Sequence, residues 1–258
     1  MNVLRQRLEN KEKIYGSIVS LTDPALCEIM GNIGFDCVWI DTEHTYMSYK
    51  EVLCHLNAAR ATGTPAVVRL PQDDFTATKK ILEMGPEGII FPMVRSAEEL
   101  EHLMDTVLYP PLGSRGFGPL RAIGYGALDA KEYVDKTNFE MLRFVQIEHI
   151  GLIDDLDKII ENPYVDGYIF GPNDLSASLG EFLEVFNETT VEKIEYAVKK
   201  LKAAGKTVGL ACGSSPKAIE FWSAMDFDML FAGADWDFVY NMGKSTLKTM
   251  KEQKKNLV

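Results

Sequence analysis

Residues 190–216, TVEKIEYAVKKLKAAGKTVGLACGSSP, contain the pattern that decides the fold. Apolar residues recur with helical period over Thr190–Ala204, and the glycine that follows is placed to end that helix. A short apolar run, Thr207–Ala211, comes next and is typical of a buried strand. Ser215 and Pro216 then supply an N-cap followed by proline, which predicts the start of another helix.

The same alternation of helix and strand extends along the rest of the chain. Further helical patterns cover Ser48–Thr62, Ala97–Leu108 and Pro216–Met225. Eight apolar runs predict strands: Tyr15–Leu21, Cys37–Asp41, Ala66–Leu70, Gly88–Val94, Arg143–Glu148, Gly167–Gly171, Thr207–Ala211 and Met229–Gly233. Eight parallel strands with crossover helices close into a (β/α)₈ (TIM) barrel, so we expect this α/β fold as a single domain over residues 1–258. An open, doubly wound sheet is the alternative.

Length and composition agree with that expectation. The chain has 258 residues, which suits a barrel of about 250. With 46% hydrophobic and 25% charged residues, it is neither a disordered nor a fibrous protein. It carries 38 acidic and 27 basic side chains, a net charge of −11, which argues against a nucleic-acid or anionic-membrane partner. An anionic small-molecule substrate is not excluded, because a pocket can be locally positive.

Cysteine usage and the first residues predict a cytoplasmic protein. Cys27, Cys37, Cys54 and Cys212 form no CxxC pair, and we expect reduced thiols. The opening segment, MNVLRQRLENKEKIYG, lacks the apolar core and cleavage site of a signal peptide. No run approaches the roughly 18 apolar residues of a membrane span.

Polar side chains gather where catalytic residues lie in a (β/α)₈ barrel, at the C-terminal ends of the strands. The predicted strands end in, or are followed by, Asp41-Thr42-Glu43-His44, Arg69, Gln146-Ile147-Glu148 and Gly171-Pro172-Asn173-Asp174. One histidine, one arginine and several carboxylates therefore converge on one face, which predicts a functional site. No lysine ends a predicted strand, since Lys206 precedes its strand at the opposite rim. A Schiff-base aldolase is therefore disfavoured.

Glu148 and Asp174 follow two adjacent predicted strands. Two carboxylates in that position suit Mg²⁺ or Mn²⁺, whose other coordination positions are taken by water and substrate oxygens. The alternative for each carboxylate is a helix cap or an ion pair with a lysine. A zinc site is not expected, because no cluster of cysteines and histidines has the spacing of zinc ligands.

Asp41 and His44 lie three residues apart at the end of the second predicted strand. A carboxylate bonded to one ring nitrogen makes the other nitrogen a general base at neutral pH; a structural histidine held by a cap is the alternative. Arg69 brings a charge to the end of an apolar strand and needs an anion, either a structural carboxylate or a substrate oxyanion. His55 and His102 lie in helical stretches, where packing or a solvated face is expected.

Five segments together resemble the signatures of the HpcH/HpaI family, the metal-dependent class II pyruvate aldolases. They are WIDTEH (39–44), VVRLP (67–71), YPPLGSRGFGPLRA (109–122), FVQIEH (144–149) and YIFGPNDLSASLG (168–180). The similarity runs nearly end to end. It implies a barrel that reversibly cleaves a 4-hydroxy-2-oxoacid to pyruvate, or a close analogue, and an aldehyde. It also implies a divalent cofactor, Mg²⁺ or Mn²⁺ with Co²⁺ as a third option. A homo-oligomer, hexamer or trimer, is implied as well, with a C-terminal helix from about residue 236 exchanged between subunits.

The resemblance also assigns roles to residues of this chain. Glu148 and Asp174 match the two metal ligands, His44 matches the base and Asp41 its orienting partner. Arg69 matches the arginine beside the pyruvate carbonyl oxygen, and Gln146 the glutamine near the metal. The backbone of Gly171, Pro172 and Asn173 matches the cradle for the pyruvate carboxylate.

Three positions depart from the family pattern. His149, Asn173 and Pro86 stand where threonine, alanine and alanine are usual, and they bear on substrate preference. Other functions stay open at this point. They are an acyl-CoA lyase of the malyl-CoA or citrate-lyase β type, a barrel that binds an oxoacid without turnover, and a phosphate-binding barrel that uses Cys212–Ser215 and Gly233.

Overall fold

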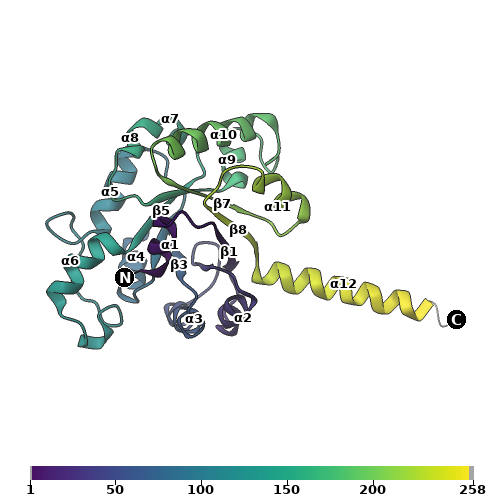
Figure 1. Ribbon diagram of the computed structural model, residues 1–258, viewed down its shortest axis with the longest axis horizontal. Helices are drawn as coiled ribbons and strands as arrows, with labels where there is room; N and C mark the ends of the chain where they lie inside the picture. Colours follow the sequence, from purple (N-terminus) through teal and green to yellow (C-terminus); the bar gives the residue numbers. More distant parts are fainter. Residues whose placement is uncertain (1, 256–258) are drawn as a thin grey trace.

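The computed structural model describes residues 2–255, with side chains as far as residue 252. Its eight strands pair in parallel in sequence order, and β8 pairs with β1, so the sheet closes into a barrel (Figure 1). The predicted closed barrel is confirmed, and the β1–β8 pairing excludes the open sheet. The strands are β1 Ile14–Val19, β2 Cys37–Asp41, β3 Ala66–Arg69, β4 Gly88–Phe91, β5 Leu142–Ile147, β6 Gly167–Phe170, β7 Thr207–Cys212 and β8 Met229–Ala234.

Helices connect the strands and surround the barrel. They are α1 Val3–Glu9, α2 Ala25–Ile33, α3 Tyr49–Thr62, α4 Phe75–Glu83, α5 Ala97–Val107, α6 Ala130–Glu140, α7 Ile150–Asp154, α8 Leu156–Ile160, α9 Pro172–Ser178, α10 Glu188–Ala203, α11 Pro216–Ser223 and α12 Asp235–Lys255. A 3₁₀ turn, η1, spans Gly124–Gly126. Three of these helices begin at serine N-caps, because the Ser48, Ser96 and Ser215 hydroxyls each accept a backbone N–H from the first turn.

The apolar side chains of the barrel form two cores. The larger core lies between the strands and the surrounding helices. The smaller core contains Trp39, Phe144 and Phe231 from the strands and Leu4 from α1, all fully buried. The Trp39 and Phe231 rings pack nearly perpendicular to each other, with 5.2 Å between the ring centroids. These side chains fill the interior of the barrel, and catalytic clefts of (β/α)₈ barrels form at the carboxyl ends of the strands.

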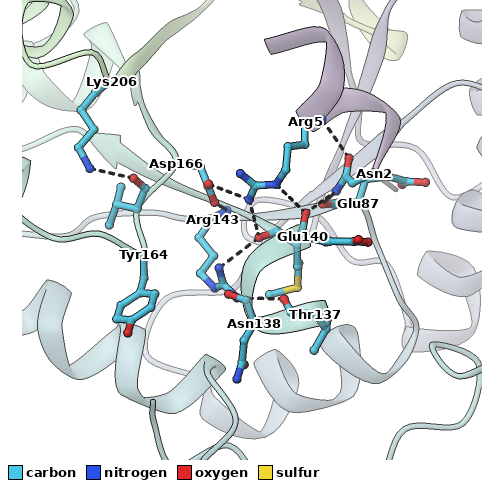
Figure 2. Close-up of polar contacts among 12 residues, drawn as sticks. Asn2, Arg5, Glu87, Thr137, Asn138, Glu140, Arg143, Tyr164, Asp166 and Lys206 are labelled. Atoms are coloured by element: carbon cyan, nitrogen blue, oxygen red, sulfur yellow. Dashed lines mark hydrogen bonds and ion pairs between the residues drawn. The ribbon is translucent and has the colours of Figure 1, made fainter. Parts of the chain in front are cut away.

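A buried polar network closes the N-terminal end of the barrel (Figure 2). Asn2 donates to the backbone carbonyls of Glu87 and Glu140, at 2.6 and 3.0 Å. The Arg5 guanidinium forms an ion pair with Asp166 at 2.8 Å, and the other Asp166 oxygen accepts the Arg143 N–H. The Arg143 guanidinium in turn donates to carbonyls at the end of α6 (Thr137, Asn138 and Met141). The network thus joins α1 and α6 to the strands.

The last helix differs from the others in its surroundings. Helix α12 projects away from the barrel at the right of Figure 1. It exposes large apolar side chains along its length: Trp236, Val239, Tyr240, Met242, Leu247 and Met250. None of the helices described is long and apolar enough to cross a membrane.

Candidate active site

A cleft of about 960 Å³ opens at the carboxyl ends of the strands. All nine residues predicted for the site line it: Asp41, His44, Arg69, Gln146, Glu148, Gly171, Pro172, Asn173 and Asp174. They come from β2 and the loop after it, from β3, from β5 and the residue after it, and from the loop and helix after β6. Parallel strands in register bring their ends together, which is why positions far apart in the sequence meet here.

Asp41 holds Arg69 rather than His44, which corrects the expected pairing. Both residues are the last of their strands and stand opposite each other in the β2–β3 register. Arg69 Nε donates to Asp41 Oδ1 at 2.9 Å, and Nη2 donates to Oδ2. Such a two-point pair fixes the guanidinium plane. Asp41 Oδ1 also accepts the Glu43 N–H at 3.0 Å. The expected contact between Asp41 and His44 is therefore replaced in the described structure by contacts of Asp41 with Arg69 and Glu43.

Glu43 stands where Asp41 was expected. Its Oε2 lies 3.1 Å from Arg69 Nη1 and 3.7 Å from His44 Nε2. Burial raises the pKa of Glu43, and the Arg69 guanidinium offsets part of the rise. His44 itself is about two-thirds exposed at the mouth of the cleft. The sequence places Glu43 beside His44, but only the position of Arg69 shows that Glu43 lies between the two.

Gln146 and Glu148 occupy the floor of the cleft. Gln146 Nε2 donates to Glu148 Oε1 at 2.7 Å, and Gln146 Oε1 lies 3.5 Å from Arg69 Nη1. The second Glu148 oxygen accepts the backbone N–H of Met93 at 2.9 Å. Met93 has a left-handed backbone (φ 53°), which a methionine rarely adopts. The sequence analysis missed the Met93 N–H as a partner of Glu148, because a backbone donor leaves no signal in the residue types.

The surroundings of Glu148 fit a divalent cation. The side chain is 3% exposed, and burial raises its pKa from 4.5 to about 8, with the Asp174 charge adding to the rise. Arg69 is engaged by Asp41 and Glu43 and does not form an ion pair with it in the described structure. A Cβ on Gly171 would lie 2.5 Å from Glu148 Oε1, so the glycine leaves room for this carboxylate. A buried carboxylate beside a second one needs positive charge, which a bound cation provides.

The carboxylates of the cleft are the residues that could hold a metal ion. Among the described residues no group of three or more His, Cys, Asp or Glu side chains could hold a metal ion. Glu148 and Asp174 are two carboxylates of the cleft that could hold a divalent cation with positions left for water and substrate. The described lining also contains no lysine, and Lys206 donates to carbonyls at the opposite rim, as predicted.

Of the three departures from the family pattern, only Asn173 lines the cleft. His149 is the N-cap of α7, and its Nδ1 accepts the Gly151 N–H at 3.0 Å. Pro86 lines a separate cavity of about 290 Å³. His55 is buried between the carbonyls of Glu51 and Leu21. Helical packing of His55 is thus confirmed, and Asn173 is the departure that can reach a ligand in the cleft.

Comparison with models of protein families identifies the family of this chain. The sequence model described as HpcH/HpaI aldolase/citrate lyase matches residues 15–216. The chain belongs to this family. The match starts in β1 and ends at the start of α11, so it includes all nine predicted site residues.

Individual relatives in the HpcH/HpaI family agree with that assignment. A hydroxypyruvate/pyruvate aldolase of Roseovarius nubinhibens is 32% identical over 81% of each protein. A 2-keto-3-deoxy-L-rhamnonate aldolase of Klebsiella pneumoniae is 30% identical over 81% of this chain and 78% of the relative. The crystal structure of an HpcH/HpaI aldolase from Desulfitobacterium hafniense superposes with a TM-score of 0.90 at 27% identity, covering 98% of both chains.

Proposed function

We propose that this protein is a divalent-metal-dependent aldolase, an aldehyde-lyase. It catalyses the reversible retro-aldol cleavage of a 4-hydroxy-2-oxoacid to pyruvate, or a close analogue, and an aldehyde. Family membership and the aldolase relatives support the reaction class. The observation that carries the mechanism is the buried Glu148 carboxylate beside Asp174, next to an arginine fixed by two carboxylates.

Glu148 and Asp174 would hold the cation, Mg²⁺ or Mn²⁺ with Co²⁺ as a third option. When bound, it supplies Lewis-acid polarisation of the substrate carbonyl. Gln146 would keep Glu148 oriented, because its amide donates to Oε1. The Met93 N–H holds the other oxygen. Both oxygens of the Glu148 carboxylate are therefore held by hydrogen bonds from the chain.

Arg69 and His44 would carry out the bond-breaking chemistry. The C3–C4 bond breaks, its electron pair delocalises from C3 onto the 2-oxo oxygen, and Arg69 donates hydrogen bonds to that developing oxyanion. His44 takes the proton of the 4-hydroxyl, so C4 leaves as the aldehyde. A proton returned to C3 completes pyruvate. Asp41 acts by positioning the guanidinium, and Glu43 lies between Arg69 and His44.

The substrate carboxylate would bind at the turn between β6 and α9. Gly171, Pro172 and Asn173 form this turn and line the cleft. Pro172 has no N–H, so the first free donors of the helix come from the residues after it. Asn173 is exposed and sits at this position, where it would contact the substrate.

We further propose that the chain is one domain and works as a cytoplasmic homo-oligomer, a hexamer or trimer. Helix α12 extends beyond the barrel with exposed apolar side chains, which supports its exchange between subunits. Single exposed apolar residues are normal, but a helix that leaves the body with six of them needs a covering surface.

The deciding experiment is proton NMR of pyruvate in D₂O with the purified protein. With Mg²⁺ or Mn²⁺ we expect the methyl signal to disappear as C3 protons exchange, and with EDTA we expect it to persist. Exchange that continues in EDTA would overturn metal dependence. Exchange that is absent with either metal would overturn the aldolase, and acyl-CoA substrates would be tested next.

A further inference from the structure

The side chains of β2 alternate between the two apolar cores as the strand approaches the cleft. Val38 and Ile40 belong to the larger core, whereas Cys37 and Trp39 belong to the smaller core inside the barrel. Asp41, two residues beyond Trp39, is on the same side of the strand and lines the cleft. Trp39 lines the cleft as well, so it lies where the inner core meets the candidate active site.

Trp39 packs against the arginine that the proposed mechanism uses. In the β2–β3 register Asp41 is opposite Arg69 and Trp39 is opposite Val67, so Trp39 and Arg69 are diagonal neighbours. The Arg69 guanidinium carbon lies over the indole ring, 5.2 Å from the ring centroid. A cation is attracted to the negative face of an aromatic ring, and the attraction is stronger away from water. Both side chains are buried here, so the contact is desolvated.

The indole restrains Arg69 in a direction that the carboxylates leave free. Asp41 accepts hydrogen bonds from two nitrogens of the guanidinium, and Glu43 lies beside the third. Hydrogen bonds to a guanidinium lie close to its plane, so they restrain movement within that plane more than movement out of it. A ring against the face of the guanidinium restrains the second kind of movement. Orientation matters because a catalytic group displaced by about 1 Å loses much of its effect.

Trp39 is itself held by Phe231 from β8. The planes of the two rings are 80° apart, and their centroids are 5.2 Å apart. A Cβ on Gly16 in β1 would lie 2.5 Å from the Phe231 ring and 2.9 Å from the Cys37 carbonyl oxygen, so the glycine leaves room for Phe231. Strands β1, β8 and β2 thus contribute to one packed column that ends at Arg69.

Packing alone does not account for a tryptophan at this position. Its Nε1 is buried and has no hydrogen-bond partner among the described residues. A buried N–H without a partner costs free energy, and phenylalanine or leucine would avoid that cost. What tryptophan adds is the ring face toward Arg69, because the indole is the aromatic ring that attracts a cation most strongly.

We propose that Trp39 is a positioning residue for Arg69, whose guanidinium it holds in the orientation that stabilises the developing oxyanion. The proposal rests on the proposed aldolase function. Trp39 acts through Arg69, and Arg69 acts when negative charge develops on the 2-oxo oxygen of the substrate. Loss of the ring should therefore lower kcat and leave metal affinity and KM for pyruvate nearly unchanged.

The test measures exchange of the pyruvate methyl protons in D₂O per folded molecule, with saturating Mg²⁺ and several pyruvate concentrations. Trp39→Leu removes the ring, and Trp39→Phe keeps a ring with a weaker attraction for cations. Phe144→Leu is the matched control, because Phe144 is a fully buried aromatic residue of the same core and is not among the described residues that line the cleft. Both Trp39 variants are also combined with Arg69→Ala, and calorimetric titration gives the Mn²⁺ affinity of each protein.

We expect Trp39→Leu to lower kcat by about tenfold and Trp39→Phe by about threefold, with KM for pyruvate and Mn²⁺ affinity within about twofold of the wild type. Phe144→Leu should unfold more easily but keep the wild-type kcat per folded molecule. With Arg69→Ala already present, neither Trp39 variant should lower kcat further. A wild-type kcat for Trp39→Leu, an undiminished loss in the Arg69→Ala background, or an equal loss in Phe144→Leu would overturn the proposal.

A second measurement decides the question if Trp39→Leu does not fold. Protein made with 5-fluorotryptophan or 5,7-difluorotryptophan keeps the shape of the indole while its ring face becomes less negative. We expect kcat to fall with each added fluorine, by about twofold or more for the difluorinated protein. Trp39→Phe protein made with the same amino acids is the control, since it retains Trp222 and Trp236, and it should show no such trend. A kcat that does not change with fluorination would overturn the proposal.

The two proposals fail in different ways. If the wild type exchanges pyruvate protons and the Trp39 variants match its kcat, only the positioning role of Trp39 fails. If the wild type exchanges no protons with Mg²⁺ or Mn²⁺, the proposed aldolase function fails and the positioning role fails with it.

Discussion

At the scale of single residues, Gly171 shows how a missing side chain shapes the site. A Cβ there would meet Glu148 Oε1 at 2.5 Å and its Cγ at 2.7 Å, so Gly171→Ala must displace the carboxylate. We expect metal affinity to fall by about 10–100-fold, the range seen when the support of a ligand is disturbed. Calorimetric titration with Mn²⁺ measures this. Gly118→Ala is the control, since a Cβ at Gly118 meets nothing within 4 Å, and it should bind Mn²⁺ as the wild type does.

Glu148 also gives the metal-free protein a pH dependence with a defined sign. Burial raises its pKa from 4.5 to about 8. Between pH 4.5 and 8, therefore, Glu148 is protonated in the folded state and ionised in the unfolded state. Stability of the EDTA-treated protein should therefore fall as pH rises from about 5 to 8. Thermal unfolding at several pH values checks this, with Glu148→Gln expected to show a flatter profile. Saturating Mg²⁺ should reverse the trend, because the cation binds the deprotonated form. A flat wild-type profile would contradict the assignment.

Arg69 is the residue whose loss we expect to cost most in catalysis. Its guanidinium is fixed by Asp41 and Glu43 and has Nη1 near Gln146. Arg69→Ala should lower kcat by about 10²–10³-fold, as loss of one oxyanion donor does elsewhere. Steady-state kinetics with pyruvate and glyceraldehyde measures it. Wild-type turnover would move the oxyanion donor to another group.

The same residues show what a sequence can predict about a site. Membership of the cleft followed from strand ends, and all nine predicted residues line it. Pairing within the cleft did not follow. Asp41 and His44 are close in sequence, but the β2–β3 register sets Asp41 opposite Arg69, and register depends on the closed sheet. As a result, Asp41 contacts Arg69, whereas His44, in the exposed loop, lies near Glu43.

At the scale of elements, the polar network at the N-terminal end of the barrel gives a stability prediction that is separate from catalysis. Arg5 joins α1 to Asp166, which also accepts the Arg143 N–H. Arg5→Ala removes the cation and leaves a largely buried carboxylate with one partner fewer. We expect a loss of about 1–3 kcal/mol in urea unfolding. Pyruvate exchange per folded molecule should stay at the wild-type rate, since the cleft is at the other end. A slower exchange would show that the two ends are coupled.

Strand positions followed from apolar runs, but strand ends did not. The run Gly88–Val94 predicts a strand of seven residues, whereas β4 stops at Phe91. Pro92 has no N–H for the sheet, and the left-handed backbone of Met93 turns its N–H to Glu148. Similarly, β1 stops at Val19 because the next two N–H groups bond to Asp235. In both places the apolar run continues past the strand, and its backbone N–H groups bond to a carboxylate instead of to the neighbouring strand.

At the scale of the whole molecule, the closed barrel was predictable because eight strands with helical crossovers have few other arrangements. The direction of α12 was not predictable from the residues alone. Its apolar positions have helical spacing in any packing, and the sequence does not say which surface covers them. Phe238, near the start of α12, packs against the larger core, and the rest of the helix projects from the barrel.

The exposed face of α12 makes the oligomer testable. Trp236, Tyr240, Leu247 and Met250 recur at spacings of four, seven and three residues, which places them on one side of the helix, and each is more than half exposed. Charged groups there cannot be buried without partners, so Tyr240→Glu with Leu247→Glu should prevent a partner subunit from covering the helix. Light scattering after size exclusion should show a wild-type mass of three or six chains and a lower mass for the double variant. Lys248→Glu with Glu252→Lys, which reverses an exposed ion pair on the same helix, is the control and should keep the wild-type mass. A wild-type monomer would overturn helix exchange and leave the barrel, with its cleft, as the complete functional unit.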